Sequence, residues 1–103
     1  MNKETRNSVF QKLEKMKGEI YHGNALERIV NSIYEIHNPN KKWRLSENID
    51  DCSYEDDNHD RVNEFYVHIE IDEDCYADLL CIINNSDEPQ SDWIILVKDI
   101  LVN

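Results

Sequence analysis

The chain has 103 residues and a formal net charge of −11 at pH 7, and 40% of its residues are apolar or aromatic. This length fits a single domain, residues 1–103, and the apolar fraction is too high for a disordered chain. No stretch approaches the roughly 18 continuous apolar residues of a membrane span, and the N-terminal residues lack the apolar core of a signal peptide. We therefore expect a cytoplasmic protein that does not contact membranes.

The charge is divided unevenly along the chain. Residues 1–44 hold nine of the eleven Lys and Arg but only five acids, a net charge of +4, whereas residues 45–103 carry a net charge of −15. Direct contact with nucleic acid needs Lys and Arg near the phosphates, so the acidic part disfavours it. Acidic excess of this size indicates either a strongly solvated surface or a surface for a cationic partner.

Two helices are expected in the basic part of the chain. Apolar residues recur at helical spacing in residues 4–17 and again in residues 25–37. Gly18 is expected to end or bend the first helix, and Asn24 is expected to cap the second. Pro39 ends the second helix, because the residue before a proline avoids helical geometry.

The hydrophobic pattern changes after Pro39. Strands are expected at residues 42–46, 63–72, 76–84 and 92–101, and the acidic segment at residues 47–61 is expected to be a long loop. The runs at residues 76–84 and 92–101 are densely apolar, which is typical of strands covered on both faces. Helices followed by strands predict an α+β fold, in which two N-terminal helices pack on an antiparallel sheet of three to four strands.

The segment EFYVHIEID, residues 64–72, alternates between apolar and polar residues. Its apolar residues are expected to face a core, and they are Phe65, Val67, Ile69 and Ile71. The opposite side of the strand would then carry Glu64, Tyr66, His68, Glu70 and Asp72. Acids interleaved with tyrosine and histidine suit contact with a basic protein, and a plain solvated strand face explains the same pattern.

The chain has three cysteines, Cys52, Cys75 and Cys81. An odd number without a secretion signal argues against a disulfide framework. Cys81 lies in the apolar run ADLLCIIN and is expected to be buried. Carboxylates near Cys52 and Cys75 disfavour their thiolate forms, so neither is expected to be a nucleophile.

The sequence contains no recognisable metal or catalytic motif. A calcium-binding EF-hand loop needs glycine at its sixth position and glutamate at its twelfth, and the registers that start at Asp51 and Asp56 lack both. The spacing of Cys52, His59, His68 and Cys75 matches no compact zinc module. We therefore expect no metal, no cofactor and no enzymatic activity.

The segment DDCSYEDDNHD, residues 50–60, and the strand EFYVHIEID carry much of the acidic charge. In size and charge the chain resembles the small acidic immunity proteins of bacterial toxin–immunity systems, such as contact-dependent inhibition or bacteriocin systems. The resemblance implies a basic partner, a cognate nuclease toxin, whose phosphate-binding cleft the carboxylates cover. The partner-binding residues would be Asp56, Asp57, Asp60, Glu64, Tyr66, His68, Glu70 and Asp72.

Other functions fit the same residues. A phage-type mimic of nucleic acid that inhibits a defence protein would need a similar acidic surface. A small metal-dependent enzyme, or an acidic subunit of a larger assembly, belongs to a different class. Turnover or tightly bound metal would favour the enzyme, and a large exposed apolar patch would favour the subunit.

Overall fold

The structure, a computed structural model, describes residues 2–47, 50–55, 61–85 and 88–102. In chain order the elements are α1 (Lys3–Met16), β1 (Ile20–His22), α2 (Gly23–His37), η1 (Leu45–Glu47), β2 (Asp50–Glu55), β3 (Arg61–Asp72), β4 (Cys75–Ile83), η2 (Gln90–Asp92) and β5 (Ile94–Val102). The strands form one antiparallel sheet in the order β1-β5-β4-β3-β2. Two helices combined with this sheet confirm the predicted α+β class.

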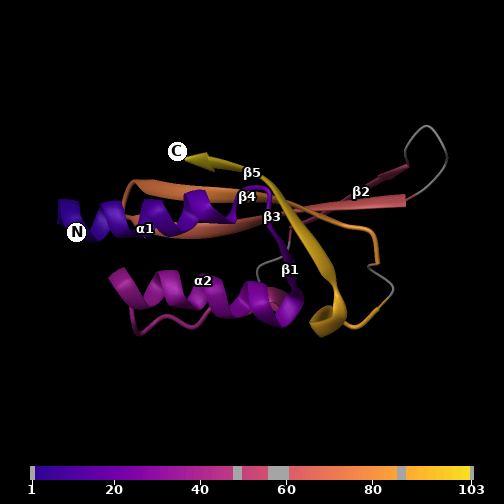
Figure 1. Ribbon diagram of the computed structural model, residues 1–103, viewed down its shortest axis with the longest axis horizontal. Helices are drawn as coiled ribbons and strands as arrows, with labels where there is room; N and C mark the ends of the chain where they lie inside the picture. The colour runs from indigo at the N-terminus through magenta and orange to yellow at the C-terminus, as the bar shows by residue number, and fades with distance from the viewer. Residues whose placement is uncertain (1, 48–49, 56–60, 86–87, 103) are drawn as a thin grey trace.

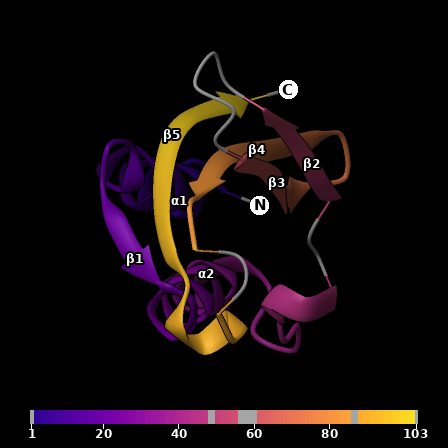
Figure 2. The ribbon, with the colours of Figure 1, turned by 90° about the vertical axis from the view of Figure 1, so that its right-hand side faces the viewer.

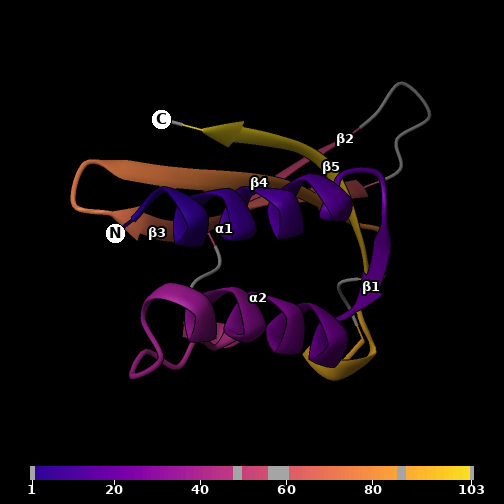
Figure 3. The same cartoon turned by 60° about the vertical axis from the view of Figure 1, so that its left-hand side comes forward.

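The helices and the sheet enclose one apolar core. Both helices run alongside the β3–β4 hairpin (Figure 1) and lie on the same side of it (Figure 2). β1 connects the end of α1 to the start of α2, so that the helices lie side by side (Figure 3). The largest fully buried side chains come from both layers and include Leu13, Tyr34, Phe65 and Leu79. Removing this apolar surface from water is the main favourable term in folding.

α1 begins at a side-chain cap and ends before a glycine. Oδ1 of Asn2 accepts a hydrogen bond from the backbone N–H of Thr5 at 2.8 Å, which satisfies one donor of the first turn. The buried residues of α1 are Val9, Leu13 and Met16. Gly18 follows the helix with a φ of 82°, a left-handed conformation that glycine adopts without strain.

α2 begins at Gly23, and its N-cap residue is His22 rather than the predicted Asn24. The backbone N–H of Gly23 donates to the carbonyl oxygen of Trp93 at 3.1 Å. A Cβ atom on Gly23 would lie 1.9 Å from the carbonyl oxygen of Gln90, so only glycine fits. This close approach fixes the first turn of α2 against the residues that precede β5.

The segment at residues 42–46 is not a strand, contrary to the prediction. The side chain of Asn31 in α2 accepts a hydrogen bond from Trp43 N–H at 2.7 Å and donates one to the Trp43 carbonyl at 3.0 Å. These bonds satisfy backbone groups that a sheet would otherwise have paired. Trp43 is 1% exposed. Its apolar signal therefore reflects burial beside α2 and not a place in the sheet.

Part of the predicted acidic loop at residues 47–61 is a strand. β2 pairs with β3 in antiparallel register, from Asp50 opposite Tyr66 to Glu55 opposite Arg61. Strand pairing uses backbone groups, and β2 satisfies an edge of β3 that would otherwise stay open. A scarcity of apolar side chains does not prevent such pairing. β1 and β2 bring the sheet to five strands, where the sequence predicted three to four.

Replacing Gly23 with alanine is expected to destabilise the protein, although alanine is normally the better helix former. The new Cβ would collide with the carbonyl oxygen of Gln90, and overpacking of this kind costs about 1–3 kcal/mol. The control is Asn24→Ala, at the next and exposed position of the helix. Equilibrium unfolding in urea should show a lower midpoint for Gly23→Ala only. Equal midpoints for both variants would contradict the close approach.

Cys81 is fully buried, as predicted, and burial raises the pKa of its thiol to about 12. Cys75 and Cys81 are both free thiols. Because the thiolate is the reactive form, we expect iodoacetamide to leave Cys81 unmodified in the native protein and to modify it in urea. Peptide mass spectrometry of the two samples measures this difference. Similar modification of Cys81 in both samples would contradict its burial.

Candidate functional site

The side chains of β3 alternate between the two faces of the sheet. Its inward residues Phe65, Val67, Ile69 and Ile71 are all buried in the core, which confirms the predicted alternation. Tyr66, His68 and Glu70 lie between them and are exposed, and Tyr66 keeps 41% of its surface in contact with water. No helix of the described chain lies on that side of the β3–β4 hairpin (Figure 2).

The strand register extends this exposed side across the sheet. His68 lies opposite Asp78, and Glu70 lies opposite Tyr76. We call the exposed side the outer face, and its residues are Ile20 and His22 of β1, Glu64, Tyr66, His68 and Glu70 of β3, Tyr76, Asp78, Leu80 and Ile82 of β4, and Ile94, Leu96, Asp99 and Leu101 of β5. Four strands, β1, β3, β4 and β5, thus build one surface.

His68, Asp78 and Tyr76 form a braced group on the outer face. Nδ1 of His68 lies 2.5 Å from Oδ1 of Asp78, and its ring stacks on Tyr76 with the ring centroids 4.7 Å apart. The side chain of His68 is 55% exposed, and that of Asp78 is 23% exposed. An aromatic stack beside a half-desolvated carboxylate is suited to a cationic side chain.

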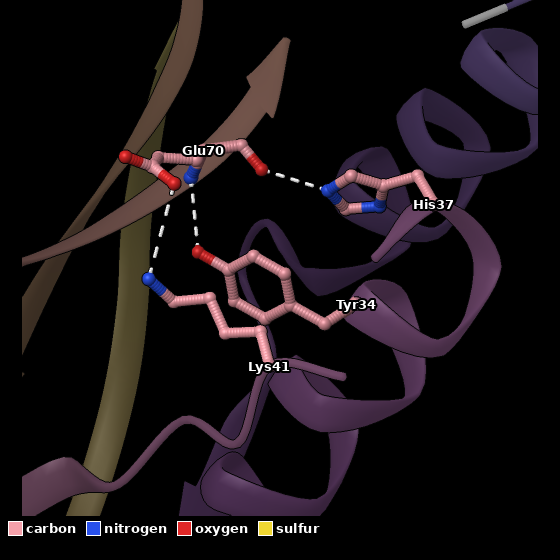
Figure 4. A network of polar contacts seen from close by, with 4 residues as sticks. All are labelled: Tyr34, His37, Lys41 and Glu70. Carbon is pink, nitrogen blue, oxygen red and sulfur yellow. Dashed lines mark hydrogen bonds and ion pairs between the residues drawn. The ribbon is translucent and has the colours of Figure 1, made fainter. Parts of the chain in front are cut away.

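Glu70 is held in place by α2 and by the loop that follows it (Figure 4). The hydroxyl of Tyr34 accepts a hydrogen bond from Glu70 N–H at 3.0 Å, and Nε2 of His37 lies 2.7 Å from the Glu70 carbonyl oxygen. Nζ of Lys41 lies 3.9 Å from the Glu70 carboxylate. Burial raises the pKa of Tyr34, so its hydroxyl stays protonated. The contacts from Tyr34 and His37 thus engage backbone polar groups at the edge of β3 past Tyr66, where its pairing with β2 ends.

Asp72 does not share the outer face with the other polar residues of β3. The β3–β4 register shifts between Glu70 and Asp72, so that Asp72 lies opposite Cys75. Cys75 belongs to the buried side of β4, and the bulge therefore places Asp72 on the helix side of the sheet. Its carboxylate accepts a hydrogen bond from the N–H of Glu73 at 2.9 Å. This corrects the expectation that all five polar residues of the strand face one way.

The structure thus brings together four of the predicted binding residues, which are Glu64, Tyr66, His68 and Glu70. Asp56, Asp57 and Asp60 lie outside the described residues. They connect β2 to β3, and in the backbone register Asp50 at the start of β2 lies opposite Tyr66.

An apolar group occupies the other end of the outer face. β1 pairs with β5 so that Ile20 lies opposite Leu96, and Leu96 in turn lies opposite Ile82 of β4. Ile20 is 63% exposed and Ile94 is 51% exposed. We call the depression at this end the apolar hollow, and its lining residues are Ile20, Ile82, Asn84, Asn85, Ile94 and Leu96.

The apolar hollow was not predicted from the sequence, because the densely apolar runs at residues 76–84 and 92–101 indicated strands covered on both faces. In β4 the side chains alternate between buried and half-buried, so only one face is fully covered. A signal was present in the sequence. Ile94, Ile95 and Leu96 are consecutive, which places apolar side chains on both faces of a strand, while two expected helices suffice for one face.

No family model, curated protein or solved structure matches the chain. Among the described residues, no three His, Cys, Asp or Glu side chains gather closely enough to hold a metal ion. Within the same residues, no helix combines the length and the apolar character needed to cross a membrane.

Replacing Tyr34 with phenylalanine should destabilise the protein by about 1–3 kcal/mol, because Glu70 N–H loses its acceptor while the packing of the ring is kept. Tyr66→Phe is the control, since it removes a hydroxyl from an exposed ring. Denaturant unfolding of both variants measures the difference. The network in Figure 4 would be refuted if Tyr34→Phe were as stable as the control.

Proposed function

We propose that the protein is an acidic binding module that neutralises a basic protein, as an immunity protein neutralises a nuclease toxin in the bacterial cytoplasm. One observation carries the proposal: exposed aromatic and acidic side chains of β3 and β4 lie together on a face that neither helix covers. Aromatic side chains supply contact area at protein interfaces, and carboxylates supply charge complementarity to a basic partner.

In this proposal the two N-terminal helices pack on the sheet as its support, and the outer face makes the contacts. The binding residues are Glu64, Tyr66, His68 and Glu70, joined by Asp56, Asp57 and Asp60 from the β2–β3 connection. Asp72 is not among them, because the bulge places it on the helix side of the sheet. The contacts of Tyr34 and His37 with Glu70 hold the strand before any partner arrives. A surface that is ordered in advance loses less conformational entropy on binding.

The charge distribution supports a partner that normally binds phosphates. The net charge of −15 in residues 45–103 is far from what solubility requires, and such an excess costs stability through self-repulsion. Carboxylates on a surface can replace phosphates in a basic cleft. The same charge distribution would also suit a mimic of nucleic acid. The identity of the captured partner, a toxin or a defence protein, distinguishes an immunity protein from such a mimic.

A second candidate function is an acidic subunit of a permanent assembly. The exposed apolar residues favour it, since Ile20, Ile94 and Leu101 are each about half or more exposed. Permanent interfaces are larger and more apolar than transient ones. The isolated chain would then self-associate or precipitate at micromolar concentration, whereas the binding module stays a soluble monomer until its partner is added.

Neutralising two acids of the outer face should slow association with the partner. The full chain is used to capture its partner, and the purified pair is then studied by surface plasmon resonance at low and at high salt. We expect Glu64→Gln with Glu70→Gln to lower the association rate several-fold at low salt, because steering by charge raises association rates by ~10-fold to ~1000-fold in total. High salt should reduce the difference, since the Debye length is about 8–10 Å at 0.10–0.15 M.

The matched control is Glu14→Gln with Glu35→Gln, which changes the net charge equally at exposed positions of the two helices. It should leave the association rate close to that of the wild type. Asp56, Asp57 and Asp60 replaced together by asparagine should also slow association. If the outer-face variant and the helix variant changed the association rate equally, the acids of the outer face would act only through the net charge, and the proposal would be wrong.

A further inference from the structure

We propose that the apolar hollow receives one large apolar side chain of the basic partner, so that recognition combines an apolar anchor with cations around it. The inference rests on the proposed function and adds the chemistry of the partner's contact segment. It concerns residues of β1, β4 and β5 that the proposal above does not use.

The hollow is preformed, because hydrogen bonds fix its walls. Oδ1 of Asn85 accepts from Ile94 N–H at 3.0 Å, and Nδ2 of Asn85 donates to the Asp92 carbonyl at 3.1 Å. On the other side, Val97 N–H donates to the Glu19 carbonyl at 3.0 Å. These bonds hold the start of β5 and the residue before β1. A preformed hollow binds an incoming side chain at a lower entropic cost than a mobile one.

The hollow also exposes apolar side chains to water, and this exposure contributes nothing to the core. The exposed Ile20 and Ile94 flank Leu96 and Ile82, so the exposure is contiguous and not scattered. Contiguous exposed apolar surface marks sites of interaction, whereas single exposed apolar residues are normal.

The charges around the hollow favour a basic segment of a partner over a second copy of the chain. Glu64 lies opposite Ile82 across the β3–β4 ladder, and Glu19 directly precedes Ile20. Asp99 lies opposite Leu80 on the same face, but Nζ of Lys17 lies 3.2 Å from its carboxylate, so the charge argument rests on Glu64 and Glu19. Two copies of a chain with a net charge of −11 would oppose these acids to each other, which is unfavourable. A segment that carries its apolar side chain between lysines and arginines complements them.

The strand register sets the spacing of the segment. Ile82 at the hollow and Asp78 in the braced group are four residues apart on β4 and share the outer face. At roughly 3.3 Å per residue, this separation is about 13 Å. An extended segment of the partner would span it with an apolar side chain at one position and an arginine four residues later. The arginine would lie against the stacked rings of His68 and Tyr76.

Peptides of matched sequence test the inference. The probe is acetyl-Trp-Ser-Lys-Ser-Arg-amide, and one control peptide has alanine in place of tryptophan. Titration into labelled protein, followed by NMR, should shift the signals of Ile82, Ile94 and Leu96 with the tryptophan peptide only. Its dissociation constant should be about tenfold lower than that of the alanine peptide, as expected for burial of an aromatic ring.

Substitutions at exposed residues test whether the tryptophan of the peptide binds in the hollow. Ile20→Thr with Ile94→Thr should remove the advantage of tryptophan over alanine, while Leu101→Thr, at an exposed position outside the hollow, should keep it. A second control peptide, acetyl-Trp-Ser-Glu-Ser-Glu-amide, should bind at least about tenfold more weakly than the basic probe.

Several results would overturn the inference. These are equal affinities for tryptophan and alanine peptides, shifts confined to the region of His68 and Tyr76, equal binding of the acidic peptide, and concentration-dependent shifts at Ile20 and Ile94 without peptide, which would assign the hollow to a second copy. The first three results leave the proposed function intact, whereas self-association would also favour the permanent subunit over the binding module. The proposed function itself fails if the acids Glu64 and Glu70 prove irrelevant to binding of the captured partner.

Discussion

One packing constraint governs the properties of this protein: the buried sides of the two helices share a single apolar core with the residues of one face of the sheet, and the other face contributes nothing to that core. The covered face holds Phe65, Val67 and Ile69 together with the buried sides of α1 and α2, and this contact supplies the core. The opposite face has no layer of described residues to pack against it (Figure 2). Its side chains therefore contact water or a partner. The charged residues and the exposed apolar residues of this face are both compatible with its position outside the core.

The outer face divides into two ends with different physical roles. At one end Tyr66, His68 and Glu70 present aromatic rings and carboxylates. Charge acts over several ångströms, so in the proposed function this end would govern how fast a cationic partner arrives. At the other end Ile20 and Ile94 present apolar surface, which acts only in contact. In the proposed function this end would govern how long the partner stays. A surface with both ends suits tight and selective binding of one basic protein better than a uniformly acidic face would.

The sequence predicted features that depend on local pattern and missed features that depend on pairing. The alternation of Phe65 and Val67 is local, and it correctly predicted which side of β3 is buried. Trp43 had the apolar signal of a strand, but its backbone bonds to Asn31 lie in the tertiary structure. The bulge that displaces Asp72, and the pairing that brings Ile20 beside Leu96, join segments whose proximity no single window of sequence contains. The candidate site was therefore predictable only in part: the sequence indicated its acidic strand and did not indicate its apolar end.

The most direct test is whether the outer face of the isolated protein is in contact with water. Methyl NMR with a soluble gadolinium chelate measures this residue by residue, because relaxation of a methyl group rises as the chelate approaches it. The account predicts strong enhancement for Ile20, Ile94 and Leu101, and weak enhancement for Ile69, Leu79 and Ile95 on the covered face. Weak enhancement at Ile20 and Ile94 in the monomer would contradict it, since the outer face would then already be covered.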